Sequence, residues 1–236
     1  MGGRLEVGTG HTKADLQGSI TEVEVVSNSV FVFTFVRSRR LPQIGAKRLR
    51  MRLLLIVALF CGSADAQVVN VTIFTESQCP FCTRLLREQI WPFHATRPGI
   101  MNLQIIPFGK GNCEYTYDRQ LSCACMHGPT ECDLNRLQNC AISYFPRRHL
   151  GLVTCIQGLA NLEEAFTRCL SRLSPKSQQR LMDCARTQTG EVLNYYSMVN
   201  THRAGVRIWP TAYVNGRFFD RSYPMETEIC RHTDYC

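Results

Sequence analysis

The stretch VVNVTIFTESQCPFC, residues 68–82, decides the fold of this chain. Residues 68–75 alternate in polarity and are rich in Val, Thr and Ile, which predicts a β-strand, and the next three residues supply a turn. A helix is expected to begin at the cysteines, because Pro80 suits the first helical position and apolar residues then recur at helical spacing. Two cysteines, Cys79 and Cys82, therefore lie at the junction of a strand and a helix.

The strands elsewhere in the chain have the order of a thioredoxin-like fold. Residues 102–108 form a second predicted strand, which completes a β-α-β unit with parallel strands and a right-handed crossover. Residues 210–214 and 217–219 are two further predicted strands, joined by an Asn215-Gly216 hairpin turn. A short predicted helix over residues 225–231 follows them.

A helical pattern fills the region between these two units. It runs from residue 131 to about residue 198 and is interrupted at Pro146, Gly158 and Ser174-Pro175. Pro92 is expected to kink or end the first helix of the chain. Removal of the insertion, about residues 125–200, leaves β-α-β followed by β-β-α. The predicted fold class is therefore α/β, a thioredoxin-like fold with a long, disulfide-rich helical insertion.

The segment before the first strand has the layout of a secretory signal peptide. Basic residues within 47–52 precede the apolar run 53–60, and small residues follow it. This run is far shorter than the roughly 20 residues that a membrane-spanning helix needs, so no stable membrane insertion is expected. We expect residues 51–66 to be the signal peptide, with translation starting at Met51. Residues 1–50 are then expected to be a non-native or dispensable extension; a real extension, with residues 23–36 as a weak strand or poor anchor, is the alternative.

Loss of residues 1–66 changes the charge and the cysteine count of the chain. The full chain has 27 basic and 19 acidic residues and a net charge of +8. Because nine of the basic and five of the acidic residues lie in the lost segment, the domain 67–236 has a net charge of +4, and the case for nucleic-acid binding weakens. One of the 13 cysteines is also lost. The 12 that remain are an even number, typical of a disulfide framework in an oxidising compartment.

The Cys79-Pro80-Phe81-Cys82 motif has the spacing of a thiol-disulfide exchange centre. Such a centre needs one accessible, easily ionised sulfur and a second sulfur that can resolve the mixed disulfide. At a helix N-cap, unpaired N–H groups and the helix dipole would stabilise the thiolate of Cys79, whereas Cys82 would be more buried. We expect Cys79 to be the nucleophile and Cys82 the resolving thiol of a redox-active disulfide. A structural disulfide and half of a zinc site are the alternatives for this motif.

Pro210 is the candidate substrate-positioning residue. It lies in Ile208-Trp209-Pro210-Thr211, directly before the predicted hairpin. In thioredoxin-like folds this position carries a cis proline that packs against the cysteine pair and offers backbone for substrate pairing, and Pro210 resembles that residue. An ordinary trans proline at the start of a strand is the alternative.

A second motif, CMHGPTECDLN at residues 125–135 followed by Cys140, is the most distinctive stretch of the chain. It resembles the signature CQHGxxECxxNxxxxC of the gamma-interferon-inducible lysosomal thiol reductase family, with Met126 in place of the usual Gln. The upstream CxxC, the helical insertion and the proline strand fall in matching order, so the resemblance covers residues 68–236. It implies an enzyme that reduces disulfides of proteins delivered to acidic endosomes or lysosomes, with the CxxC pair as its working thiols and no cofactor.

The remaining cysteines are expected to form structural disulfides, whose connectivity the sequence does not determine. Cys125, Cys132 and Cys140 should attach the signature loop and the first insertion helix to the core. A metal site formed by Cys123, Cys125, His127 and Cys132 is the alternative, but the spacing lacks a paired CxxC and secreted thiols tend to oxidise. His127 is expected instead to stabilise the loop by hydrogen bonding. The full set of candidates is Cys113, Cys123, Cys125, Cys132, Cys140, Cys155, Cys169, Cys184, Cys230 and Cys236.

The expected function is reduction of protein disulfides in an endosomal, lysosomal or secreted compartment. Its partners would be disulfide-containing protein substrates and a small-thiol or protein reductant. A disulfide oxidase or isomerase of the secretory pathway is one alternative, because the reduction potential decides the direction; a redox-inert, disulfide-rich binding protein is another. On a secretory route the sequon Asn70-Val71-Thr72 predicts glycosylation of Asn70, with an unmodified strand residue as the alternative. Cys236 would permit a disulfide-linked dimer, although an intrachain staple is favoured.

Overall fold

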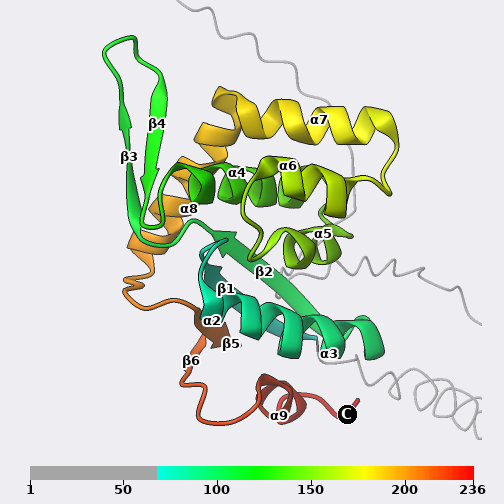
Figure 1. Cartoon of the computed structure of the whole chain (residues 1–236). Coiled ribbons are helices and arrows are strands. Elements are labelled where there is room, and N and C mark those ends of the chain that lie inside the picture. Colours follow the sequence, from blue (N-terminus) through cyan, green and yellow to red (C-terminus); the bar gives the residue numbers. More distant parts are fainter. Residues whose placement is uncertain (1–67) are drawn as a thin grey trace, which may run out of the picture. The chain divides into compact units, whose positions relative to one another are not determined.

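Strand β1 (Val69–Thr75) is the centre of a four-stranded sheet with the order β2-β1-β5-β6 (Figure 1). β2 (Met101–Pro107) runs parallel to β1, whereas β5 (Thr211–Val214) is antiparallel to it and pairs in turn with β6 (Arg217–Phe219). The strands and the hairpin turn lie where the sequence predicts them. The structure is a computed structural model and describes residues 68–236. The predicted extension 1–50 and the predicted signal peptide 51–66 lie outside the described residues.

Alternation along β1 explains why this strand is central. Val69, Val71 and Ile73 are each at most 1% exposed and enter one hydrophobic core. That core also contains residues of the first helix and of α9 (Met225–Cys230). Because the side chains of a strand alternate between its faces, this pattern fixes which face of the sheet the helices cover.

The first helical run follows β1 and continues farther than expected. It consists of α2 (Pro80–Arg84), a π-helical segment (Leu85–Ile90) and α3 (Trp91–Thr96). We expected Pro92 to kink or end this helix, and it does not end it. Pro92 lies in the first turn of α3, directly after the π-helical segment, and a proline is tolerated in a first turn because no donor is missed there.

The helical insertion lies in sequence between the β3–β4 segment and β5, and it has its own core. It comprises α4 (Pro129–Tyr144), α5 (His149–Ile156), α6 (Leu162–Ala165), a π-helical segment (Phe166–Leu170), α7 (Pro175–Arg186) and α8 (Gln188–Arg203). Leu134, Leu137 and Leu181 are fully buried in this second core. Among the described residues, no helix is both long and apolar enough to cross a membrane.

A hairpin of two short strands, β3 (Gly111–Tyr115) and β4 (Leu121–Cys125), was not predicted. Its strands contain no β-branched residue, so the usual strand signal is absent. Figure 1 shows the hairpin extending away from the four-stranded sheet, beside α8. Cys113 and Met198 pack together at its base, and a disulfide joins Cys113 to Cys123 across the two strands. The hairpin leads directly into the signature loop.

Candidate active site

The CxxC motif lies at the junction of β1 and α2, with Cys79 as the N-cap of the helix. Its Sγ accepts a hydrogen bond from the backbone N–H of Cys82 at 3.3 Å, and Pro80 occupies the first turn. A side chain at an N-cap satisfies a helix donor that would otherwise lack a partner. Cys79 and Cys82 are the two free cysteines of the region that the structure describes.

The two sulfurs differ strongly in acidity. A hydrogen bond with the Cys82 side chain lowers the pKa of Cys79 from 9.0 to about 7, and the Cys82 backbone N–H adds to this effect against an opposing contribution from burial. Burial raises the pKa of the Cys82 thiol far above its ordinary value, and the neighbouring Cys79 raises it further. Cys79 is therefore the sulfur that can ionise near neutral pH, and only a thiolate is an effective nucleophile.

Cys79 is less accessible than we expected, with only 5% of its surface exposed. The Trp209–Pro210 peptide bond is cis, and the carbonyl oxygen of Trp209 lies 4.0 Å from the Cys79 Sγ. The structure therefore brings the predicted proline loop against the cysteine pair. Phe81, inside the motif, remains 63% exposed and so presents an apolar side chain to solvent next to the sulfurs.

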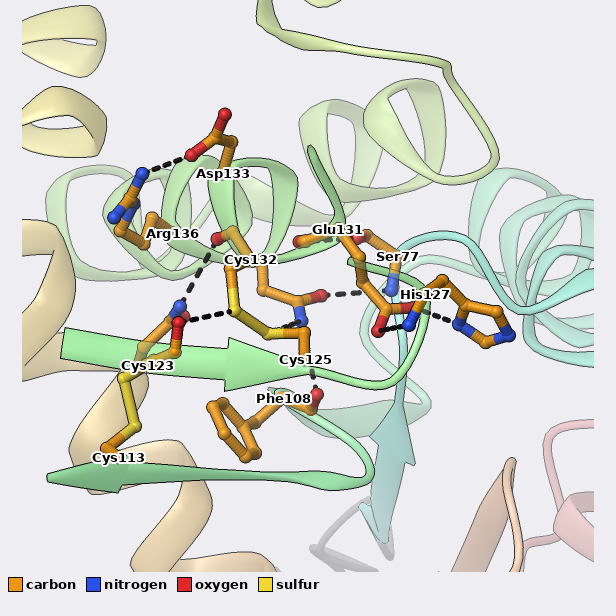
Figure 2. Close-up of a disulfide and its surroundings, with 12 residues drawn as sticks. Ser77, Phe108, Cys113, Cys123, Cys125, His127, Glu131, Cys132, Asp133 and Arg136 are labelled. Carbon is orange, nitrogen blue, oxygen red and sulfur yellow. Dashed lines mark hydrogen bonds and ion pairs between the residues drawn. A yellow bond between two sulfur atoms is a disulfide. The ribbon is translucent and has the colours of Figure 1, made fainter. Parts of the chain in front are cut away.

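In the signature loop, His127 contacts two buried carboxylates, one of which belongs to the turn before the motif. Glu131 accepts hydrogen bonds from the backbone N–H of His127 at 3.2 Å and from its ring Nδ1 at 2.5 Å (Figure 2). Glu76, the residue after β1, has its Oε2 at 3.9 Å from the same ring nitrogen. Gly128, with a φ of 93°, provides the turn that begins α4.

Hydrogen bonds from the helical insertion, mainly from α4, hold the turn before the CxxC motif. Asn135 is fully buried; its Oδ1 accepts from the Ser77 backbone N–H at 2.9 Å, and its Nδ2 donates to the Phe108 carbonyl at 3.1 Å. The Ser77 hydroxyl donates to the Glu131 carbonyl, and Gln157 donates to the Glu76 carbonyl. The insertion is thus attached to the redox turn by polar contacts as well as by packing.

Ten cysteines of the described region form five disulfides. Three of these pairs are close in sequence: Cys113–Cys123, Cys125–Cys132 and, at the C-terminus, Cys230–Cys236. The other two join helices of the insertion: Cys140–Cys184 and Cys155–Cys169. Cys125–Cys132 closes the signature loop, as Figure 2 shows. We expected Cys140 to help attach the first insertion helix to the core, and this was wrong. Its disulfide with Cys184 joins α4 to α7 inside the insertion and does not reach the core around β1. Cys236 pairs within the chain.

These pairings bear on the alternative metal site. Cys123, Cys125 and Cys132 are bonded to other sulfurs, so they offer no thiolate ligands. Glu76, His127 and Glu131 have ligand atoms within 4.8 Å of one another. However, the ring nitrogen that faces the carboxylates is already hydrogen-bonded to Glu131, which is the loop-stabilising role expected of His127.

Asn70, the predicted glycosylation site, lies on β1 with its side chain exposed. Its Oδ1 accepts a hydrogen bond from Asn102 at 2.8 Å. Its backbone N–H donates to the side chain of Asn215 in the hairpin turn. Glycosylation of Asn70 stays a prediction.

Comparison with known proteins adds to this geometry. Residues 70–173 match the family model described as gamma interferon inducible lysosomal thiol reductase (GILT). A GILT-like protein of Caenorhabditis briggsae is 30% identical over 150 residues, which cover 59% of this chain and 68% of that protein. This chain belongs to the GILT family. A GILT-like protein of Caenorhabditis elegans is 33% identical over 171 residues, or 69% of this chain, but the chain spans only 52% of the length of that relative.

The GILT family is described as a family of thiol reductases, and the thioredoxin-like fold of this chain agrees with that description. The crystal structure of oxidised BdbD from Bacillus subtilis is similar in fold, with a TM-score of 0.53 and 14% sequence identity. The match covers 72% of this chain and 90% of the BdbD chain. The predicted fold class, a thioredoxin-like fold with a disulfide-rich helical insertion, is confirmed. The lysosomal thiol reductases among the relatives and the five disulfides fit a protein of the secretory or lysosomal route.

One residue of the GILT site was missed by sequence reasoning. Glu76 was assigned only to the turn after the first strand, yet it is 3% exposed and its backbone contacts both cysteines of the motif. The available signal was a carboxylate directly after a buried strand and three residues before the first cysteine. Its carboxylate contacts Lys110 and His127, which lie far along the chain, and a local pattern does not reveal such contacts.

Proposed function

We propose that this chain reduces disulfide bonds of protein substrates through Cys79 and Cys82, in an acidic endosomal or lysosomal compartment or after secretion. The supporting observation is the pair of free cysteines at the N-cap of α2, one with a lowered pKa and one deeply buried. This asymmetry is what a dithiol reductant needs, because one sulfur attacks and the other resolves.

The chemistry proceeds in two exchanges. The Cys79 thiolate attacks one sulfur of the substrate disulfide, forms a mixed disulfide and releases the other substrate sulfur as a thiolate that takes up a proton. Cys82 then loses its proton, attacks Cys79 and releases the second substrate thiol, so that two electrons have passed to the substrate. The resulting Cys79–Cys82 disulfide is returned to the dithiol by a small-thiol or protein reductant.

Two features beside Cys79 suit an unfolded protein substrate. The exposed ring of Phe81 offers an apolar contact next to the nucleophile. Beyond the cis peptide bond, a pocket offers the apolar side chains of Ile208, Pro210, Tyr213 and Phe218, with Arg207 and Arg221 also in its lining. Pro210 would position the substrate backbone, and this surface would accept apolar side chains with little sequence preference.

Insulin reduction at pH 5 and pH 7 tests the proposal. The full chain should reduce insulin, Cys79→Ser should lose the activity by at least about 1000-fold because no nucleophile remains, and Cys82→Ser should accumulate a mixed disulfide with insulin. A matched control removes a structural pair, Cys113→Ser with Cys123→Ser, and should keep the activity. Equal activity of the parent chain and Cys79→Ser would overturn the mechanism.

The same site could run in the oxidising direction, and the lowered pKa of Cys79 favours that alternative because a stabilised thiolate stabilises the reduced form. The reduction potential separates the two. A potential below roughly −200 mV supports a reductase, whereas a value near the −120 mV of strong disulfide oxidants would indicate disulfide formation.

A further inference from the structure

The imidazole of His127 lies between two buried carboxylates and solvent. Glu131 is fully buried and holds the ring Nδ1 at 2.5 Å and the backbone N–H at 3.2 Å. The Glu76 carboxylate, with 4% of its side chain exposed, lies 3.9 Å from the same Nδ1. The imidazole side chain is 37% exposed and therefore reaches solvent, whereas both carboxylates are buried.

Glu76 connects this cluster to the sulfurs. Its backbone N–H donates to the Cys82 Sγ at 3.5 Å, and its carbonyl accepts from the Cys79 backbone N–H at 3.3 Å. Its carboxylate accepts from the Lys110 backbone N–H at 2.7 Å. A negative charge at this position works against the thiolate of Cys79, because like charges that lie close together disfavour ionisation.

The charges around the cluster come from four parts of the chain. Glu76 follows β1, Lys110 follows β2, His127 and Glu131 belong to the signature loop and α4, and the two thiols begin α2. The hydrogen bond with Glu131 raises the pKa of His127, and the charges of Glu131, Glu76 and Cys79 raise it further against the opposing effect of burial. Burial raises the pKa of Glu76, while the Lys110 N–H and the charge of His127 lower it. His127 is therefore a cation in acid.

We propose that the His127 imidazolium, held in place by Glu131, is the counter-charge that keeps the Cys79 thiolate available in acidic surroundings despite the nearby Glu76 carboxylate. This proposal rests on the proposed function, since it assigns a role in thiol chemistry to the signature loop. His127 acts on Cys79 through space and is a positioning residue; the hydrogen bonds to Glu131 fix where its charge lies.

Opposite charge changes on the two sides of the cluster should move the acidity of Cys79 in opposite directions. His127→Gln removes the cation, so the pKa of Cys79 should rise by about one pH unit, whereas Glu76→Gln removes the anion and should lower it by a similar amount. The thiolate fraction of Cys79 at pH 5 should therefore be about tenfold lower in His127→Gln than in the parent chain. His127→Lys restores the charge and should recover the parent behaviour.

The test titrates the thiolate absorbance near 240 nm between pH 4 and pH 9 in the reduced full chain, with no substrate present. The control is His232→Gln, which removes another histidine that pairs with a glutamate four residues away, here Glu228 on α9. It should leave the titration unchanged because the His232–Glu228 pair belongs to the C-terminal segment, where Glu228 also contacts Tyr223 and Arg231. A merely structural role of His127 predicts shifts of the same sign for all variants of the cluster.

Two outcomes overturn the proposal. The first is a Cys79 midpoint that His127→Gln leaves unshifted. The second is a midpoint that His127→Gln and Glu76→Gln shift in the same direction and that His127→Lys does not restore. Opposite shifts in His127→Gln and Glu76→Gln, with rescue by His127→Lys, support it. Because this titration needs no substrate, absence of insulin reduction together with these shifts would reject the proposed function and leave the counter-charge role standing.

Discussion

The redox turn and the helical insertion use cysteine in opposite ways. In the redox turn, Cys79 and Cys82 belong to one strand–helix junction, and both sulfurs are free. In the insertion, by contrast, each sulfur is bonded to one from another element, as in Cys140–Cys184 between α4 and α7. Burial does not separate the two classes, because Cys82 and Cys140 are both fully buried. What separates them is the setting of Cys79, where a hydrogen bond with the free Cys82 side chain and the backbone donors at the helix N-terminus lower the pKa of the sulfur.

Alkylation with iodoacetamide should give the largest contrast between the two regions. In the native chain treated with a mild reductant, Cys79 should react first, and its rate should follow the thiolate with a midpoint near pH 7. Its pKa is lowered, so the thiolate predominates above the midpoint and the rate falls about tenfold per pH unit below it. Mass spectrometry of the labelled peptides at a series of pH values measures this.

The matched control is Cys82, which the same reagent should leave unlabelled at these pH values because it is buried and its pKa is raised. Labelling of Cys82 as fast as Cys79, or a midpoint at the ordinary pKa of a thiol, would contradict the assigned division of roles. Labels on the ten bridged cysteines under these conditions would mean that the five disulfides are as labile as the redox pair.

The redox turn could be predicted from the sequence because its signals are local. The alternation in β1, the proline after Cys79 and the Asn215-Gly216 turn each act within a few residues. The signature at residues 125–135 indicated the family for the same reason, since its spacing is read directly from the chain. The N-cap position of Cys79 followed from these elements alone.

The contacts between the two regions could not be predicted in this way. Asn135 binds Ser77 and Phe108, and the distance in sequence hides both contacts. The β3–β4 hairpin was missed because its strands carry polar side chains and cysteines in place of β-branched residues. The pairing of the ten cysteines depends on which helices meet, and neither helix propensity nor spacing gives that information.

Removal of single disulfides should show that the insertion depends on its sulfurs for stability. Cys140→Ala with Cys184→Ala removes a disulfide that closes a loop of 44 residues and should reduce the free energy of unfolding by about 4 kcal/mol. Removal of the Cys230–Cys236 disulfide, with a separation of 6 residues, should reduce it by about 2 kcal/mol. The difference arises because a disulfide across a longer loop restricts the unfolded chain more. Denaturation by guanidinium chloride, fitted for midpoint and slope, measures both losses.

The redox turn supplies the control for these variants. Neither Cys140 nor Cys184 contributes to the acidity of Cys79, so the alkylation midpoint near pH 7 should survive their removal in the folded protein. An unchanged free energy of unfolding would show that the pair is dispensable. A moved midpoint would show that the two regions are less separate than their sulfurs suggest.

Asn135 offers the way to test how the two regions are joined. Replacement with Leu leaves the Ser77 N–H and the Phe108 carbonyl without partners in a buried place, at a cost of about 3 kcal/mol in the free energy of unfolding. Asn112→Leu, on the exposed side of β3, should change it by less than about 0.5 kcal/mol. Because Ser77 lies two residues before Cys79, its release should also loosen the redox turn, and Cys82 should then become labelled by iodoacetamide. A loss of stability with Cys82 still protected would mean that the insertion stabilises the fold without positioning the dithiol.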